Sequence, residues 1–259
     1  MALPMMTYLQ GGAQQTTEID VEAINFNGSS STILYDNNLW RDFSANTPTM
    51  TCSFWIKPVS ENNFFADFIA TCPTAGDNDH IIALLKGTGG DGQMGVWFNL
   101  ESGAGSSNGL SVQTNTGITI GSWNHVLFSV SSSSPSSPDL VINGSAVSPT
   151  ISYNNTTMFG DSATEDSRMG SHDGAGSSQV DFLDGDLAEF FLKNTYYDLS
   201  QQSNIELFRS SAGKPVDVSA LSPLVYLNGN ASTWTNSGSS SLGTQTLTDI
   251  TTASTSPSD

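Results

Sequence analysis

Short stretches in which apolar and polar residues alternate recur through this sequence, and turn residues separate them. In MTCSFWIKP, every second residue from Met50 to Ile56 is apolar, and Ser53 and Lys57 lie between or after them. An extended chain places successive side chains on opposite faces, so this period of two predicts a strand with one face toward a core. Pro58 then ends the strand, because proline cannot donate a ladder hydrogen bond.

Further strands are predicted along the chain, at 80–86, 94–100, 109–114, 123–130 and 138–144. The stretch DLVINGSAV predicts a β-hairpin, since Asn143-Gly144 suits the tight two-residue turn between two extended arms. Helical periodicity is absent between these strands. The chain is therefore predicted to be all-β, an antiparallel sandwich or barrel, because a parallel α/β sheet would need alternating helices.

Two other stretches predict local details of the sheets. AINFNGSSST reads as a strand that ends at a hairpin-type turn, Asn27-Gly28. VDFLDGDLAEFFLKN has apolar residues on both faces, with Leu187 and Phe191 opposite Ala188 and Phe190. A strand of that kind belongs in the middle of a sheet that is covered on both sides.

One short helix is predicted near residues 200–211. Ser200 is the candidate cap, and SNIE from Ser203 is a second possible capping box. Gly213 and Pro215 then end the helix.

The length of 259 residues suits one large β-domain. We expect an N-terminal arm at 1–21, a sandwich at 22–250 that includes weaker C-terminal strands, and a flexible polar tail at 251–259. The arm carries apolar residues with no element of their own, at Leu3, Met5, Met6, Tyr8 and Leu9. Such an arm is either an attachment segment that needs a partner surface or a disordered terminus.

The charge balance excludes one class of partner. The chain has 25 acidic and 7 basic residues and a net charge of −18. A protein that follows the phosphates of a nucleic acid needs the opposite sign, so no nucleic-acid partner is expected. The N-terminus has neither a signal peptide nor a membrane-spanning run, so synthesis in a cytoplasm without membrane insertion is expected.

The two cysteines, Cys52 and Cys72, match no zinc or redox spacing. They are expected to be small buried apolar residues, although pairing in an oxidising compartment stays open.

The order of several stretches resembles that of laminin-G-like domains in the concanavalin A-like superfamily. These stretches are AINFNGSSSTILY, MTCSFWIKP, GSWNHVLFSV, PDLVINGSAV and FLDGDLAEFFLKN, followed by YYDLSQQSNIELF. The resemblance covers residues 22–210 and implies two antiparallel sheets in a concanavalin A-like jelly roll. It also implies that Trp123 and His125 in GSWNHVLFSV are structural, not catalytic.

The downstream sequence GKPVDVSALSPLVYLNGN resembles sequence found after such domains in virion proteins of tailed, often marine, bacteriophages. This resemblance implies a non-enzymatic virion component of capsid or tail. Its expected partners are other virion proteins and host-surface glycans. Fittings of this kind follow local symmetry, so a homotrimer is expected.

Acidic loops raise the alternative of a calcium-dependent lectin. Calcium takes carboxylate and carbonyl oxygens as ligands, often from loops, and laminin-G-like relatives often hold it at the rim of the sandwich. The candidate ligands are Asp77, Asp79, Asp161, Asp166 and Asp173. Solvated surface charge is the competing interpretation.

A second alternative is a glycoside hydrolase, which needs two carboxyl groups across a cleft. Asp184 and Asp186 alternate on the predicted strand, but the Glu-first pattern of hydrolases with this fold is absent. Sugar binding without hydrolysis needs an exposed aromatic ring. The candidates are Trp40, Trp97 and Trp234, of which Trp97 is expected to be in the core.

Overall fold

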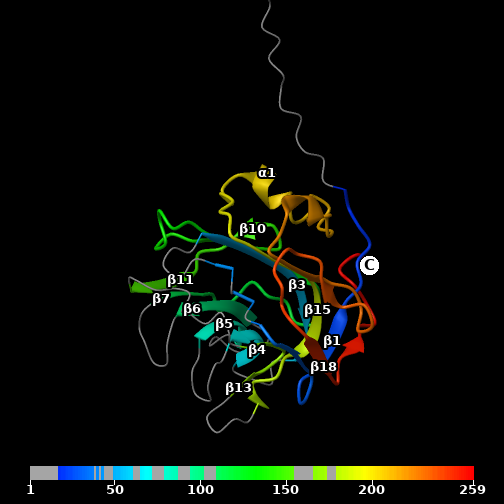
Figure 1. Ribbon diagram of the computed structural model, residues 1–259. Coiled ribbons are helices and arrows are strands. Elements are labelled where there is room, and N and C mark those ends of the chain that lie inside the picture. The colour runs from blue at the N-terminus through cyan, green and yellow to red at the C-terminus, as the bar shows by residue number, and fades with distance from the viewer. Residues whose placement is uncertain are drawn as a thin grey trace, which may run out of the picture.

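The computed structural model describes residues 17–37, 39–40, 42–43, 49–60, 65–71, 79–86, 94–101, 109–154, 166–173 and 179–259. Two large sheets pack face to face (Figure 1). Within each sheet the neighbouring strands are antiparallel. The prediction of an all-β sandwich with one short helix is confirmed.

The nine-stranded sheet has β15 near its middle. Its strand order is β10 (Ser145–Ala146), β9 (Asp139–Ile142), β8 (Asn124–Val130), β3 (Met50–Pro58), β15 (Asp184–Lys193), β1 (Ile24–Asn27) and β19 (Thr251–Thr252). The second half of β15 pairs instead with β16 (Val225–Asn228), which pairs with β17 (Thr235–Asn236). Along one edge of β15, the first half thus pairs with β1 and the second half with β16. Along the other edge, β15 pairs with β3.

The eight-stranded sheet forms the second layer. Its order is β11 (Thr150–Asn154), β7 (Gly109–Gln113), β6 (Met94–Glu101), β5 (Asp79–Lys86), β4 (Phe65–Thr71), β12 (Ser167–Met169), β2 (Thr32–Tyr35) and β18 (Gln245–Thr248). A small ladder joins β13 (His172–Asp173) to β14 (Gln179–Val180).

The main core lies between the two sheets. The alternation predicted for β3 is confirmed, because Met50, Cys52, Phe54 and Ile56 are fully buried in this core. Phe98 of β6 stacks on Phe128 of β8 with ring centroids 4.3 Å apart, so the contact links the two layers directly. Offset aromatic packing of this kind adds to the free energy of burial.

The outer face of the nine-stranded sheet is also covered. The one-turn helix α1 (Gln202–Ile205) and the chain after it, with a 3-10 turn η1 (Ser219–Leu221), lie on the side away from β5 and β6 (Figure 1). Ile205, Phe208 and Val216 pack there against Leu127 and Phe191 of the sheet. A strand with apolar residues on both faces therefore has both faces buried, as predicted for β15.

The predicted assignment of faces on β15 is wrong in its second half. Leu187 and Phe190 point into the main core, while Ala188 and Phe191 lie on the outer face. A β-bulge between Ala188 and Phe191 shifts the register against β3, and Glu189 has a left-handed φ of 53°. One extra residue in a strand moves every later side chain to the opposite face.

The hairpin predicted at Asn27-Gly28 is also wrong. β1 and β2 belong to different sheets, so the turn carries the chain from one layer to the other. The Asn27 Oδ1 atom accepts hydrogen bonds from the amides of Ser29, Ser30 and Ser31 at 2.9 to 3.1 Å. An Asx side chain that satisfies three amides stabilises a wide turn in place of a two-residue one. The hairpin predicted at Asn143-Gly144 is confirmed, with φ of 53° and 80° at these two residues.

The helix is shorter than its sequence suggested. Neither Ser200 nor Ser203 caps it, because the N-cap is Gln201, which makes no side-chain capping bond. Ser200 instead donates from its amide and hydroxyl to Asp198 Oδ1 at 3.0 and 2.6 Å.

The C-terminal tail is ordered, contrary to the expectation for 251–259. Thr251 and Thr252 pair with β1, and Ala253 donates its amide to the carbonyl of Ala23 at 3.0 Å. The tail is held because β1 has a free edge that a polar strand can join.

The start of the described chain is held to the loop after α1. Glu18 forms a bridge with Val216, and the amide of Ile19 donates to the carbonyl of Pro215 at 3.2 Å. Residues 17–21 of the predicted arm thus belong to the domain surface. Its apolar residues Leu3, Met5, Met6, Tyr8 and Leu9 lie outside the described residues.

Cys52 is a free, buried cysteine, and Cys72 lies outside the described residues. In the part of the chain that the structure describes, no helix has the length and apolar character needed to cross a membrane.

Candidate functional site

The outer face of the eight-stranded sheet presents a tryptophan. Along β6, Val96 and Phe98 are fully buried in the main core, so the alternating residues Trp97 and Asn99 point the other way. Trp97 is half-buried, and its indole Nε1 donates to Ser111 Oγ on β7 at 2.8 Å. The expectation that Trp97 is a core residue is therefore wrong. Trp97 stands between two apolar residues in the sequence, and this favoured a core position. In a strand, however, its side chain points to the face opposite that of Val96 and Phe98.

Neutral polar residues lie on the β7 side of this ring in the sheet register, and Ala83 of β5 lies opposite it on the other side. Gln113 of β7 lies opposite Trp97, and Ser111 lies opposite Asn99. Ser152 of the edge strand β11 lies opposite Ser111 and is exposed. Residues that pair directly across antiparallel strands share a face. The face thus combines an aromatic ring with hydroxyl and amide groups on three neighbouring strands.

The chain after β7 crosses the outer face beside the tryptophan. Thr114 donates its amide to the carbonyl of Val96 at 2.9 Å, and Ile118 donates to that of Met94 at 3.0 Å. This crossing needs the glycine at position 95, because a Cβ atom there would lie 1.7 Å from the Thr114 carbonyl oxygen. The Thr114 carbonyl therefore lies against the outer face at Gly95, two residues before Trp97.

The other two tryptophan candidates lie in the core. Trp40 is 2% exposed and Trp234 is 4% exposed. The indole Nε1 of Trp234 donates to the hydroxyl of Tyr35 at 3.1 Å. Neither ring presents a face to a ligand, and Trp97 is the one candidate of the three that is not buried.

The predicted calcium ligands are only partly placed. Asp77 and Asp161 lie outside the described residues. Asp79 is the first residue of β5, Asp166 is an exposed residue just before β12, and Asp173 is the last residue of β13. The register of Ser167 with Thr71, and of Thr71 with Asp79, brings positions 79 and 166 to the same end of the sheet. Within the described residues no group of three His, Cys, Asp or Glu side chains could hold a metal ion, so the calcium site stays a prediction.

The two aspartates of β15 take part in structural contacts. Asp186 is 5% exposed; its Oδ1 accepts from Asn25 Nδ2 at 2.7 Å, and its Oδ2 lies 3.7 Å from Lys57 Nζ. Asp184 Oδ2 accepts from the hydroxyl of Ser60 at 2.7 Å. A hydrolytic pair must be open to the substrate and to water. The enclosed, ion-paired position of Asp186 does not suit that role.

Sequence reasoning missed the buried acid at the bulge, Glu189. It is 7% exposed, and Tyr226 donates its hydroxyl hydrogen bond to Glu189 Oε2. Burial raises the pKa of Glu189 from 4.5 to about 7, the Tyr226 bond lowers it in part, and Asp217 raises it further. The local sequence carried no signal for this position, because only the bulge places the side chain against Tyr226.

His125 is fully buried, in agreement with the structural role expected for it. Its Nε2 lies 2.8 Å from Ser53 Oγ, and its ring centroid is 4.7 Å from that of Trp55. Burial lowers the pKa of His125 to about 3, with a smaller contribution from Arg209. The imidazole is therefore neutral at ordinary pH and out of reach of a substrate.

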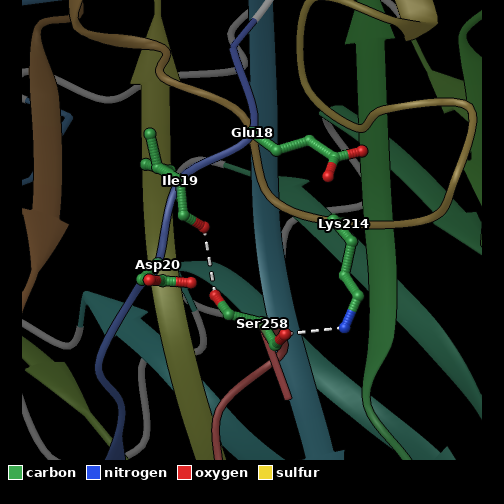
Figure 2. Close-up of a pocket in the computed structure, with 5 residues that line it drawn as sticks. All are labelled: Glu18, Ile19, Asp20, Lys214 and Ser258. Carbon is green, nitrogen blue, oxygen red and sulfur yellow. Dashed lines mark hydrogen bonds between the residues drawn. The ribbon is translucent and has the colours of Figure 1, made fainter.

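Two hollows lie away from the Trp97 face. One, of about 300 Å³, lies between the N-terminal segment, the loop at Lys214 and the C-terminal tail (Figure 2). Ser258 Oγ donates to the carbonyl of Ile19 at 3.1 Å, and Lys214 Nζ donates to the carbonyl of Ser258 at 2.6 Å. These bonds join the two ends of the described chain. A smaller hollow of about 190 Å³ is lined by residues of β2, β17 and β18 and the loop between the last two.

The sandwich and its half-buried aromatic face define a lectin-like β-domain. Residues 10–202 match the family model of the concanavalin A-like lectin/glucanases superfamily, and the chain belongs to this family. The resemblance inferred from the order of the strands is confirmed at this level. A search of curated proteins finds no match.

Two of the solved structures that the chain matches illustrate the shared fold. A heptameric SAP-like pentraxin from Limulus polyphemus has 16% identity and a TM-score of 0.57, with 90% of this chain and 96% of that chain covered. A protein from Bacteroides ovatus that is described as carbohydrate-binding has 13% identity and a TM-score of 0.57. In that comparison 92% of this chain and 61% of the other chain are covered. At these identities the likeness shows the fold alone.

Proposed function

We propose that this chain is a non-catalytic carbohydrate-binding module whose ligand lies on the Trp97 face. The observation that carries the proposal is the half-buried indole of Trp97, which its bond to Ser111 holds in place. An aromatic ring packs against the C–H face of a sugar ring, while hydroxyl and amide groups bind its hydroxyls. Gln113, Ser111 and Ser152 supply such groups on the same face.

The charge of the protein favours neutral glycans. A net charge of −18 repels polyanionic chains such as those rich in uronic acids. The residues next to Trp97 in the sheet, Gln113, Asn99 and Ser111, are neutral. Neutral hexose polymers are therefore the proposed ligand class.

A glycan array with matched variants tests this proposal. Trp97→Ala should lower the affinity for the bound glycans by at least about 10-fold, which corresponds to about 1.4 kcal/mol. Trp97→Phe keeps an aromatic ring and should retain part of the binding. Ser137→Ala, at an exposed position in the loop between β8 and β9, is the surface control. Equal binding by the parent and Trp97→Ala would refute the assignment of the face.

A chelator arm of the same array tests the predicted calcium site separately. If Asp77, Asp79, Asp161, Asp166 and Asp173 contribute a calcium site that the ligand needs, removal of calcium abolishes binding even with Trp97 intact. Binding that persists with chelator, but is lost in Trp97→Ala, leaves a calcium-independent lectin face.

We also propose that the module is a component of a bacteriophage virion, attached through the N-terminal arm as a homotrimer. The support is the resemblance of residues 213–230 to sequence in phage virion proteins and the apolar residues from Leu3 to Leu9. Deletion of residues 1–16 is the appropriate test, because residues 17–21 pack on the domain. Loss of virion incorporation is expected, with a domain of unchanged thermal stability. Undiminished incorporation would contradict attachment through the arm.

A further inference from the structure

One serine joins three segments of the chain at the hollow of about 300 Å³. The Ser258 Oγ atom accepts a hydrogen bond from the amide of Val21 at 2.9 Å and donates to the carbonyl of Ile19 at 3.1 Å. The carbonyl of Ser258 accepts from Lys214 Nζ at 2.6 Å, and Figure 2 shows Ser258 between Ile19 and Lys214. The chain before β1, the loop after α1 and the tail that follows β19 thus meet at a single residue.

The same three segments also contact one another and the domain through their backbones. The amide of Ile19 donates to the carbonyl of Pro215, and the amide of Asp217 donates to that of Thr17, both at 3.2 Å. The tail begins with β19, which pairs with β1, and the amide of Ala253 donates to the chain just before β1 at 3.0 Å. These backbone bonds do not involve Ser258.

Residues 17–21 and 251–259, here named the Ser258 latch, cover part of the outer face of the nine-stranded sheet. Under the latch, Trp55 of β3 and Ala188 of β15 belong to one apolar cluster. The latch residues that pack in this cluster are Ile19, Val21 and Ala253. Trp55 is 4% exposed, so the latch and its neighbours keep the indole ring away from water.

The latch has few contacts of the kind that make a segment stable. Strand β19 is exposed, and the bonds that Ser258 makes with its three partners are only partly buried. In contrast, β1 pairs with β15 over four residues, and Ile24 and Phe26 of β1 are fully buried in the main core. Segments with few buried apolar contacts open at a lower free energy than the whole domain. The latch should therefore open while β1 stays in the sheet.

We propose that the Ser258 latch opens as one unit, in which the segment 17–21 and the tail leave the sheet together and uncover Trp55. Ser258 belongs to the tail but bonds to the segment 17–21, so opening of either one breaks bonds that hold the other. Lys214 extends the unit to the loop after α1. A partner that binds residues 1–16 would then control the exposure of Trp55. That use rests on the proposed attachment through the arm, whereas the joint opening does not.

Amide hydrogen exchange of the ¹⁵N-labelled full chain, followed by nuclear magnetic resonance, tests the joint opening. The amides that report on it donate the bonds that hold the latch, and they are those of Ile19, Val21, Asp217 and Ala253. Ser258→Ala removes both bonds of the hydroxyl, and exchange at all four amides should become at least about 10-fold faster. Val21 loses its own acceptor, so the decisive amides are Asp217 and Ala253, which do not bond to Ser258.

A variant on the loop side makes the test more specific. Lys214→Met removes the bond of Nζ to the tail and should make exchange at Val21 and Ala253 at least about three-fold faster. The amides of Val21 and Ala253 donate to other residues, so a local effect of Lys214 would not reach them. Ser254→Ala changes an exposed serine of the same tail and is the matched control, which should exchange as the parent does.

Three results would overturn the proposal. Faster exchange confined to some of the four amides in Ser258→Ala would mean that the segments open separately. Unchanged exchange at Val21 or Ala253 in Lys214→Met would mean that the loop is not part of the unit. Equally faster exchange at the amides of β8, in the core of the sheet, would mean that the variants destabilise the whole domain and that the latch is no separate unit.

Discussion

Replacement of Glu189 by glutamine should stabilise the protein at alkaline pH. The carboxyl group is 7% exposed and sits at the bulge of β15, where burial raises its pKa from 4.5 to about 7. Above pH 7 the folded protein must hold a charge in a poorly solvated position. The amide of Glu189→Gln has nearly the same shape, keeps an oxygen to accept from Tyr226, and carries no charge.

The sign and size of the effect follow from linkage. Between pH 4.5 and 7 the folded state binds more protons at Glu189 than the unfolded state does, so this group lowers stability as the pH rises. One pH unit of difference corresponds to 1.36 kcal/mol, which gives a penalty of about 3 kcal/mol above pH 7. Below pH 4.5 the group is protonated in both states and the penalty is absent.

Urea unfolding of the parent and Glu189→Gln at pH 4, 6 and 8 measures this penalty. The two proteins should have similar free energies of unfolding at pH 4, and the variant should gain up to about 3 kcal/mol at pH 8. Glu22→Gln, at an exposed position, is the matched control for loss of one surface charge. If the variant were less stable than the parent at pH 8, or if the difference in free energy of unfolding did not change with pH, the ionised Glu189 would not destabilise the folded protein.

Two further outcomes are expected. His125 takes up its proton near pH 6.5 in the unfolded state but only near pH 3 in the folded state. The free energy of unfolding should therefore fall by about 3 kcal/mol as the pH is lowered from 7 to 4. The free energy of unfolding of His125→Gln, measured with urea, should change less with pH in this range than that of the parent. The same change with pH in both proteins would contradict the assignment. Gly95→Ala should lower stability by about 1 to 3 kcal/mol, because its Cβ would collide with the Thr114 carbonyl. Thermal unfolding checks this, with Gly121→Ala for comparison, where the added Cβ meets nothing within 4 Å and the cost comes only from its left-handed φ of 74°, a strain that Gly95 does not have.

Local patterns in the sequence were enough to predict most of the strands. The period of two in β3 and the Asn143-Gly144 turn report contacts within a few residues, so they could be read directly. The two-faced apolar pattern of β15 predicted its central place for the same reason. The order of these stretches was also enough to indicate the family.

The candidate sites needed information that no short stretch contains. Trp97 has apolar neighbours, and only the pairing of β6 with β7 shows that it shares its face with Ser111 and Gln113. Two of the predicted calcium ligands, Asp77 and Asp161, lie outside the described residues, so that prediction is unchanged.

Periodicity and turn chemistry along the chain determine the strands and the class of fold. The reversal of faces at Glu189, the ordered tail on β1 and the contacts of Ser258 were decided by the tertiary structure. The tail residue Thr252 pairs with Ile24, and Ser258 bonds to Val21 and Ile19. Contacts over such separations depend on which sheet edges are left open after the core has packed, and a local pattern cannot specify that.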